Sequence, residues 1–145
     1  MTDSLFDDQK PGHQKALRKL ENDQIAWLGS GRPDGQPHTV PVWFLWRDGQ
    51  VVIFSEERAQ KIRNLRNDNK VVVSLESGGT GSDVVILEGT AEIAGENTAA
   101  WLGRVGDAYQ TKYAEGLKGL GQSMDEMSSQ FNQVIVVTPA KLMAW

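Results

Sequence analysis

The chain has 145 residues, with 15 Lys and Arg against 19 Asp and Glu, which gives a formal net charge of −4 and a pI near 5.1. This length fits one domain over residues 1–145, and the absence of cysteine excludes disulfides, thiolate catalysis and cysteine-bound metals. The acidic balance argues against nucleic acid as a partner, and the polar N-terminus lacks the features of a secretory signal. We therefore expect a soluble, cytoplasmic protein that does not bind membranes.

A surface helix is the first predicted element, and three strands follow it. Ala16, Leu17 and Leu20 repeat at helical spacing among polar residues near 13–21, so one stripe of this helix is expected to be buried. Turn-rich segments separate the next apolar runs, which predict strands over residues 25–28, 38–46 and 51–54. Because short turns connect these strands, we expect them to pair in chain order as a meander.

The rest of the chain adds three helices and three strands. A short helix is predicted over 59–69, strands over 71–75 and 84–93, helices over 96–118 and 125–130, and a last strand over 134–137 that Thr138-Pro139 ends. Strands and helices do not alternate in the first half. The order therefore favours a mainly β fold, a small six-stranded antiparallel barrel with peripheral helices, over a parallel α/β sheet.

One local cluster departs from the acidic average. Five of the 15 basic residues fall within residues 58–70, namely Arg58, Lys61, Arg63, Arg66 and Lys70. A phosphate bound here, where a strand leads into a helix, would meet free N–H groups, the positive end of the helix dipole and the Lys61 charge, with the Ser55 hydroxyl nearby. The alternative is a solvated helix whose basic side chains face water, with Glu56 and Glu57 suiting the same N-terminus.

Pro41 interrupts an apolar strand and predicts an edge strand or a bulge, because proline cannot donate to the sheet ladder. Two interpretations stay open. The strand is a simple edge, or backbone groups at Val40 and Val42 turn toward a planar heterocycle. Trp43 and Trp46 are more typical of a core or a subunit interface than of a stacking platform.

Several common motifs are missing from the sequence. There is no phosphate loop or dinucleotide fingerprint, since Gly78, Gly79 and Gly81 precede a predicted strand and not a helix. His13 and His38 are far apart, and no metal-ligand spacing joins them. We therefore predict no metal site, and we interpret His38 as a strand-edge residue.

Four segments, in this order, resemble the pyridoxamine 5′-phosphate oxidase-like split β-barrel superfamily, above all its small deazaflavin-dependent oxidoreductase branch. The segments are RPDGQPHTVPVWF at 32–44, AQKIRNL at 59–65 with Val71 after it, LEGTA at 87–91 and PAKLMAW at 139–145. The likeness runs from about Lys15 to the end of the sequence. It implies a Greek-key split β-barrel and a homodimer with two cofactors in clefts at the subunit interface.

The resemblance also assigns a cofactor site. In such proteins the strand that matches Val40, Pro41, Val42 and Trp43 lies along the cofactor ring. The hydroxyl that matches Ser55 and the lysine that matches Lys61 hold the phosphate, and Gln60 and Asn64 lie beside them. We add the hypothesis that the neighbouring arginines meet the anionic oligoglutamate tail of coenzyme F420, the deazaflavin; these are Arg58, Arg63 and Arg66. Two departures are the missing proline in residues 68–70 and the two glutamates beside the phosphate site.

The resemblance therefore implies an oxidoreductase in which the cofactor carries the chemistry and the protein supplies orientation and electrostatics. The reduced deazaflavin would pass a hydride to an electron-poor small substrate lying over Trp43. No side chain stands out as a general acid, so we expect solvent to protonate the product. Two alternatives stay open: an FMN-binding oxidase or reductase of the same barrel, and a flavin- or tetrapyrrole-binding module without turnover.

Overall fold

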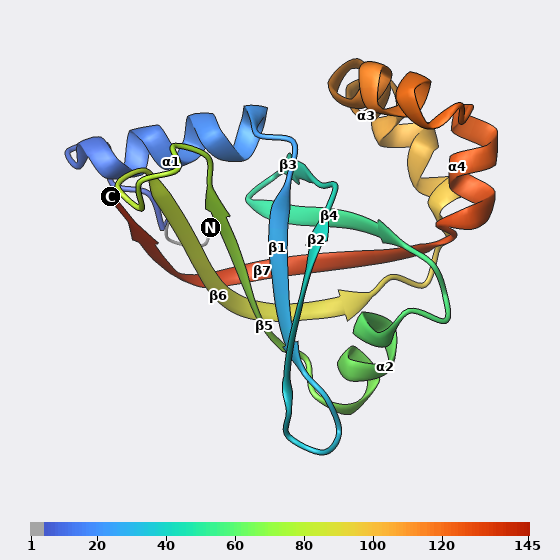
Figure 1. Ribbon diagram of the computed structural model, residues 1–145, viewed down its shortest axis with the longest axis horizontal. Helices are drawn as coiled ribbons and strands as arrows, with labels where there is room; N and C mark the ends of the chain where they lie inside the picture. The colour runs from blue at the N-terminus through green and yellow to red at the C-terminus, as the bar shows by residue number, and fades with distance from the viewer. Residues whose placement is uncertain (1–4) are drawn as a thin grey trace.

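The computed structural model describes residues 5–145, which form helices around one curled sheet (Figure 1). The helices are α1 (Pro11–Asn22), α2 (Gln60–Asn67), α3 (Thr98–Leu120) and α4 (Met124–Gln130). The strands are β1 (Ala26–Gly31), β2 (Pro37–Val42), β3 (Leu45–Arg47), β4 (Gln50–Ser55), β5 (Lys70–Glu76), β6 (Val84–Ile93) and β7 (Gln133–Ala144). Every strand pair is antiparallel. The mainly β split-barrel class is confirmed, with seven strands in the described chain and not six.

The sheet order is β2-β1-β5-β6-β7-β4-β3, which puts β2 and β3 at opposite edges although they follow each other in the chain. The predicted strand over 38–46 and the predicted meander are therefore wrong. The chain breaks at Trp43 and Phe44, where the Phe44 backbone N–H and C=O bond the Tyr113 hydroxyl and not a neighbouring strand. Each hairpin taken alone is confirmed, because β1 pairs with β2 and β3 pairs with β4.

The last strand is also longer than predicted, since Pro139 does not end it. β6 pairs with β7 along most of its length, and the register shifts between Glu88 and Gly89, directly opposite Pro139. A Cβ at Gly89 would clash with the Thr138 carbonyl oxygen, so glycine is what permits this close approach. This β-bulge accommodates Pro139 in the strand, although proline has no N–H to donate to the ladder.

Two apolar cores lie on opposite sides of the β4–β7 pair. Val51 and Ile53 of β4 face the interior of the half-barrel, whereas Val52 and Phe54 face α3 and α4. Because both faces of β4 are covered, its sequence reads as a continuous apolar run and not as an alternation.

The helices occupy separate places around the sheet. α2 packs through Ile62 and Leu65, which lie three positions apart, and α1 packs through Ala16 and Leu20 of its predicted stripe. Figure 1 shows α2 close to the β1–β2 hairpin, while α3 and α4 stand beyond the other end of that hairpin. Among residues 5–145, no helix is long and apolar enough to cross a membrane.

Candidate cofactor site

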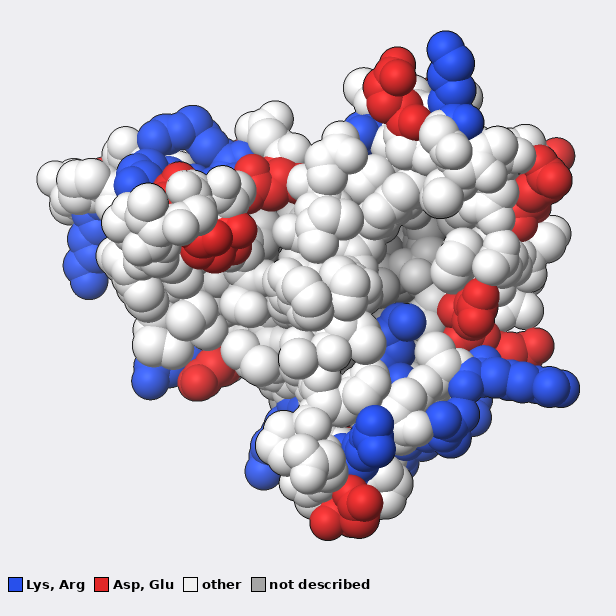
Figure 2. All heavy atoms as spheres, viewed as in Figure 1, with Lys and Arg blue, Asp and Glu red and all other residues white. Residues whose placement is uncertain are grey.

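A cavity of about 530 Å³ lies between β2, β4, α2 and the α3–α4 pair. In Figure 2 the surface is hollowed on this side of the molecule, between α2 and the two C-terminal helices. The cavity is lined by Pro41, Val42, Trp43, Phe54, Lys61, Tyr109, Gly116, Gly119, Leu120, Gln122 and Phe131. Its walls are thus mostly apolar and aromatic, and Lys61 is the lining residue that carries a charge.

Trp43 forms a flat wall of this cavity. Its ring stacks on Tyr113 with centroids 4.5 Å apart and planes 2° apart, and Tyr109 lies 6.5 Å away at a tilt. A Cβ at Gly116 would come within 2.8 Å of the tip of the Trp43 ring. The glycine in α3 therefore leaves the space that the indole occupies, and the stack fixes the orientation of the wall.

Two α3 side chains hold the chain where it crosses from β2 to β3. The Tyr113 hydroxyl donates to the Gln24 carbonyl oxygen at 2.6 Å and accepts from the Phe44 N–H at 2.8 Å. Lys112 Nζ donates to the Phe44 carbonyl oxygen at 2.8 Å and lies 3.7 Å from the centroid of the Phe44 ring. Burial lowers the pKa of Lys112 to about 8. These contacts hold the backbone of Phe44, the residue directly after Trp43.

Lys61 brings a cation to the end of the cavity nearest α2. Burial lowers the pKa of its amine, and the negative charge of Glu56 acts in the opposite direction. The Glu56 carboxylate accepts a hydrogen bond from Gln130 Nε2 of α4 at 2.8 Å, so it is held by a neighbouring helix. Glu57 is exposed. The two glutamates beside the predicted phosphate site therefore do not pair with the lysine.

Gln60 and Asn64 form a polar network behind Lys61. Asn64 is fully buried; its Oδ1 accepts from Gln60 Nε2 at 2.8 Å and its Nδ2 donates to Ser30 Oγ of β1 at 2.9 Å. The network ties α2 to the sheet. Ala59 caps α2 without a side-chain hydrogen bond, and the Ile62 N–H already donates to the Ala59 carbonyl oxygen at 3.1 Å. Within the described residues, the N–H groups of Gln60 and Lys61 are therefore the ones left for an anion.

The eight predicted cofactor residues are thus only partly brought together. Pro41, Val42, Trp43 and Lys61 line the cavity, and Gln60 and Asn64 support the helix that carries the lysine. Val40 faces the barrel core. Ser55 is fully buried, its hydroxyl donates to the Glu56 carbonyl oxygen at 3.0 Å, and it does not line the cavity.

The arginines near Lys61 point elsewhere. On an α-helix, residues two and five positions apart differ in direction by about 160° and 140°, so Arg63 and Arg66 leave α2 on other sides from Lys61. Arg63 donates to the Arg58 carbonyl oxygen and to Gln60 Oε1, both at 2.6 Å. The basic cluster of the sequence is therefore divided between Lys61 in the cavity and four exposed cations outside it, namely Arg58, Arg63, Arg66 and Lys70.

Sequence reasoning missed the α3 side of the cavity. Tyr109 and Tyr113 form a stripe at helical spacing, which is typical of any packed helix face, and both side chains are buried, which raises the pKa of both phenols. The signal for a special role was Gly116, a helix-weakening residue within that stripe. Pairing it with Trp43 required the tertiary structure.

Comparisons with solved structures show where this fold occurs. A conserved hypothetical protein from Mycobacterium tuberculosis is 25% identical, with a TM-score of 0.72 over 100% of this chain and 89% of its own. A protein described as an F420 reductase is 22% identical (TM-score 0.65; 87% and 94% covered). The heme storage protein HutZ from Vibrio cholerae is 13% identical (TM-score 0.69; 93% and 95% covered).

At the level of sequence, no curated protein matches the chain. One family model does match, described as pyridoxamine 5′-phosphate oxidase, and it spans residues 13–145. This range includes every strand of the described sheet and every residue that lines the cavity. The chain therefore belongs to the pyridoxamine 5′-phosphate oxidase family.

Proposed function

We propose that this protein is an oxidoreductase that binds a deazaflavin of the coenzyme F420 type and transfers a hydride to a small, electron-poor organic substrate. The observation that carries the proposal is the cavity, which is lined both by a tryptophan held in a stack and by a single lysine. An apolar, flat-walled cleft suits a tricyclic ring, and a cation beside an open helix N-terminus suits a phosphate.

The ring is assigned to the edge strand β2. Because β2 is the first strand of the sheet order, one side of its backbone has no partner strand within the described part of the chain, and Pro41 at the cavity edge has no N–H. In our proposal the ring lies along Val40 to Trp43, and the phosphate lies at Lys61 and the start of α2. Gln60, Asn64 and Ser55 support that start without touching the ligand.

The protein's part in the reaction is to bind, orient and exclude water. When bound, the deazaflavin supplies the hydride. Trp43 and Phe54 present apolar faces to the substrate, and Leu120, which is 66% exposed, lies at the cavity edge. In our proposal the substrate enters past Leu120 and lies between the cofactor ring and these side chains.

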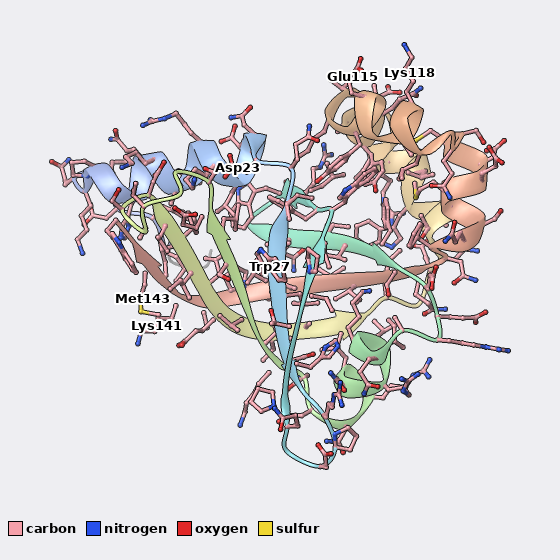
Figure 3. The ribbon with its side chains drawn as sticks, viewed as in Figure 1. Asp23, Trp27, Glu115, Lys118, Lys141 and Met143 are labelled. Atoms are coloured by element: carbon pink, nitrogen blue, oxygen red, sulfur yellow. The ribbon has the colours of Figure 1, made fainter. Side chains whose placement is uncertain are left out.

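A homodimer is part of the proposal. The outer face of the sheet carries Trp27, which is 47% exposed and pairs across the strands with Pro41 and Ser74. Figure 3 shows Trp27 on the middle of this face, and Figure 2 shows that the middle of the face carries few charges. A second copy that covers this face would also cover the edge of β2, where the ring is assigned.

FMN is the second candidate cofactor, and the directions of the arginines favour it. A deazaflavin of the F420 type carries an anionic tail, whereas FMN needs only a ring site and a phosphate site. Arg63 and Arg66 leave α2 away from Lys61, and Arg63 is already bonded to its own helix start.

The test is a titration of the purified protein with F420, FMN and hemin, followed by absorbance and fluorescence. The proposal expects F420 to bind more tightly than FMN and hemin. Tight FMN binding without affinity for the deazaflavin would contradict the proposal and make the protein an FMN-binding oxidase or reductase. Binding of hemin alone would make the protein a tetrapyrrole module.

Lys61→Ala tests the phosphate assignment. We expect it to weaken cofactor binding by about 1.5–3 kcal/mol, the scale of a hydrogen bond to a charged group, measured as a change in Kd. Arg66→Ala is the matched control on another side of the same helix. It should lower the affinity only for the long-tailed deazaflavin and leave FMN and a tailless deazaflavin unchanged. An unchanged Kd in Lys61→Ala would mean that the lysine does not hold the phosphate.

A further inference from the structure

His38 is a half-buried histidine on β2 that the proposed function has not used. It pairs across the ladder with Ser30, whose hydroxyl accepts the Asn64 hydrogen bond from α2. His38 therefore lies on the side of β2 that faces α2. Its Nδ1 is buried and has no hydrogen-bond partner among residues 5–145, and a buried ring nitrogen without a partner calls for an explanation.

The surroundings of His38 are positively charged. Burial lowers the pKa of the imidazole, and the charges of Arg32, which follows β1, and of Lys61 from α2 lower it further. His38 also borders a groove of about 630 Å³, where Lys70 of β5 and Glu88 of β6 are the charged lining residues. Glu88 is paired across the β6–β7 ladder with Lys141. His38 thus lies near cations that disfavour protonation of its imidazole.

The position of His38 matches the length of the proposed ligand. It lies four positions before Val42, and a strand rises by about 3.3 Å per residue, so the two lie about 13 Å apart along β2. Val42 borders the aromatic end of the cavity and His38 lies beside α2. In our proposal the cofactor ring and its phosphate are joined by a five-carbon chain. The cofactor lies along β2, with the ring near Val42 and the phosphate near His38.

We infer that His38 is an additional phosphate-binding residue of the cofactor site, and that it takes up one proton when the phosphate binds. This inference rests on the proposed function. A bound phosphate offsets the positive charges of Arg32 and Lys61, which otherwise disfavour a third cation. Protonation then gives the imidazole a second N–H donor and a charge that attracts the phosphate oxygens. Cofactor affinity should consequently fall as the pH rises and the bound imidazole loses its proton.

The experiment uses the fact that the chain has only two histidines. The imidazole resonances of His38 and His13 are followed by NMR through a pH titration, without ligand and with saturating cofactor. We expect binding to move the titration of His38 to higher pH and to leave the resonances of His13, which lies in α1, in place. Calorimetry in buffers of different ionisation enthalpy then counts the protons taken up.

Two variants separate charge from shape, with His13→Gln as the control. His38→Gln should raise the Kd about tenfold or more and abolish the part of the proton uptake that belongs to the protein. His38→Arg carries a permanent charge, so it should bind about as tightly as the native chain without that uptake. The phosphate can also take up or release protons on binding. Subtracting the proton uptake of His38→Arg from that of the native chain removes this contribution and leaves the uptake by His38.

An unchanged His38 titration on binding, or a native Kd in His38→Gln, would overturn the inference while leaving the proposed function in place. If neither cofactor binds the native chain, the proposed function fails, and inorganic phosphate becomes the probe. A shift of the His38 titration to higher pH with inorganic phosphate then supports the site, and no shift refutes it.

Discussion

The two ends of β2 are built in different ways. At the end that leads to β3, aromatic rings and buried hydrogen bonds hold the chain, with Trp43 stacked on Tyr113 and Tyr113 bonded to Phe44. At the other end, beside α2, the Asn64 amide joins the helix to β1, and His38 lies nearby without a partner for its Nδ1.

This difference separates two tasks within one site. The aromatic end is rigid and apolar before any ligand arrives, because its polar atoms already bond to the chain itself. The polar end holds Lys61, His38 and the start of α2, and among residues 5–145 no ion pair engages Lys61 or His38. Stability should therefore depend more on the aromatic end, and affinity more on the polar end.

The largest expected effect is on stability, from Tyr113→Ala. The side chain is fully buried, so its removal should lower the free energy of unfolding by about 3–5 kcal/mol. Denaturant unfolding measures this change. Tyr113→Phe keeps the stack and removes only the hydroxyl that bonds Phe44 and Gln24, and it should cost about 1–3 kcal/mol. If Tyr113→Phe were as stable as the native chain, the hydroxyl would not stabilise the segment that connects β2 to β3.

A smaller effect is expected from Asn64→Ala at the polar end. The variant leaves Ser30 and Gln60 without their partner, which should cost about 1–3 kcal/mol of unfolding free energy. It should also weaken cofactor binding, because α2 carries Lys61. Asn67→Ala, on the exposed side of the same helix, is the control. If Asn64→Ala destabilised the protein but left the Kd native, the network would serve the fold alone.

The last expected effect is a pH dependence from Lys112. Its pKa is about 8 in the folded chain and 10.5 ordinarily, so the unfolded chain binds more protons between these values. Raising the pH through this window therefore favours the folded state. We expect the unfolding free energy of the native chain to rise between about pH 8 and pH 10.5 relative to Lys112→Met. Parallel curves for the two proteins would show that Lys112 is not desolvated.

Much of the architecture could be predicted because it is encoded locally. The hairpins, the helix at α2 and its Ile62–Leu65 stripe follow from turn residues and spacing, and Pro41 correctly indicated an edge strand. The strand over 38–46 was the main error. Its apolar pattern is continuous, and the break at Phe44 depends on Tyr113, a residue 69 positions away.

The candidate site also contains residues that could be predicted from local sequence and residues that could not. Lys61 could be found from the sequence because it begins a helix after a strand, which is a local pattern. Ser55 could not be judged locally, since its burial depends on the strands around it. The directions of Arg63 and Arg66 follow from helix geometry only once the buried face of α2 is known.

By itself, the sequence determined the class of fold, the positions of most elements and the concentration of positive charge at the start of α2. These properties depend on spacing between near neighbours. Only the tertiary structure decided that β2 and β3 part to opposite edges, that α3 supplies a wall for the cavity, and that His38 lies beside α2. Each of these depends on contacts between residues far apart in the chain, and no local pattern records such contacts.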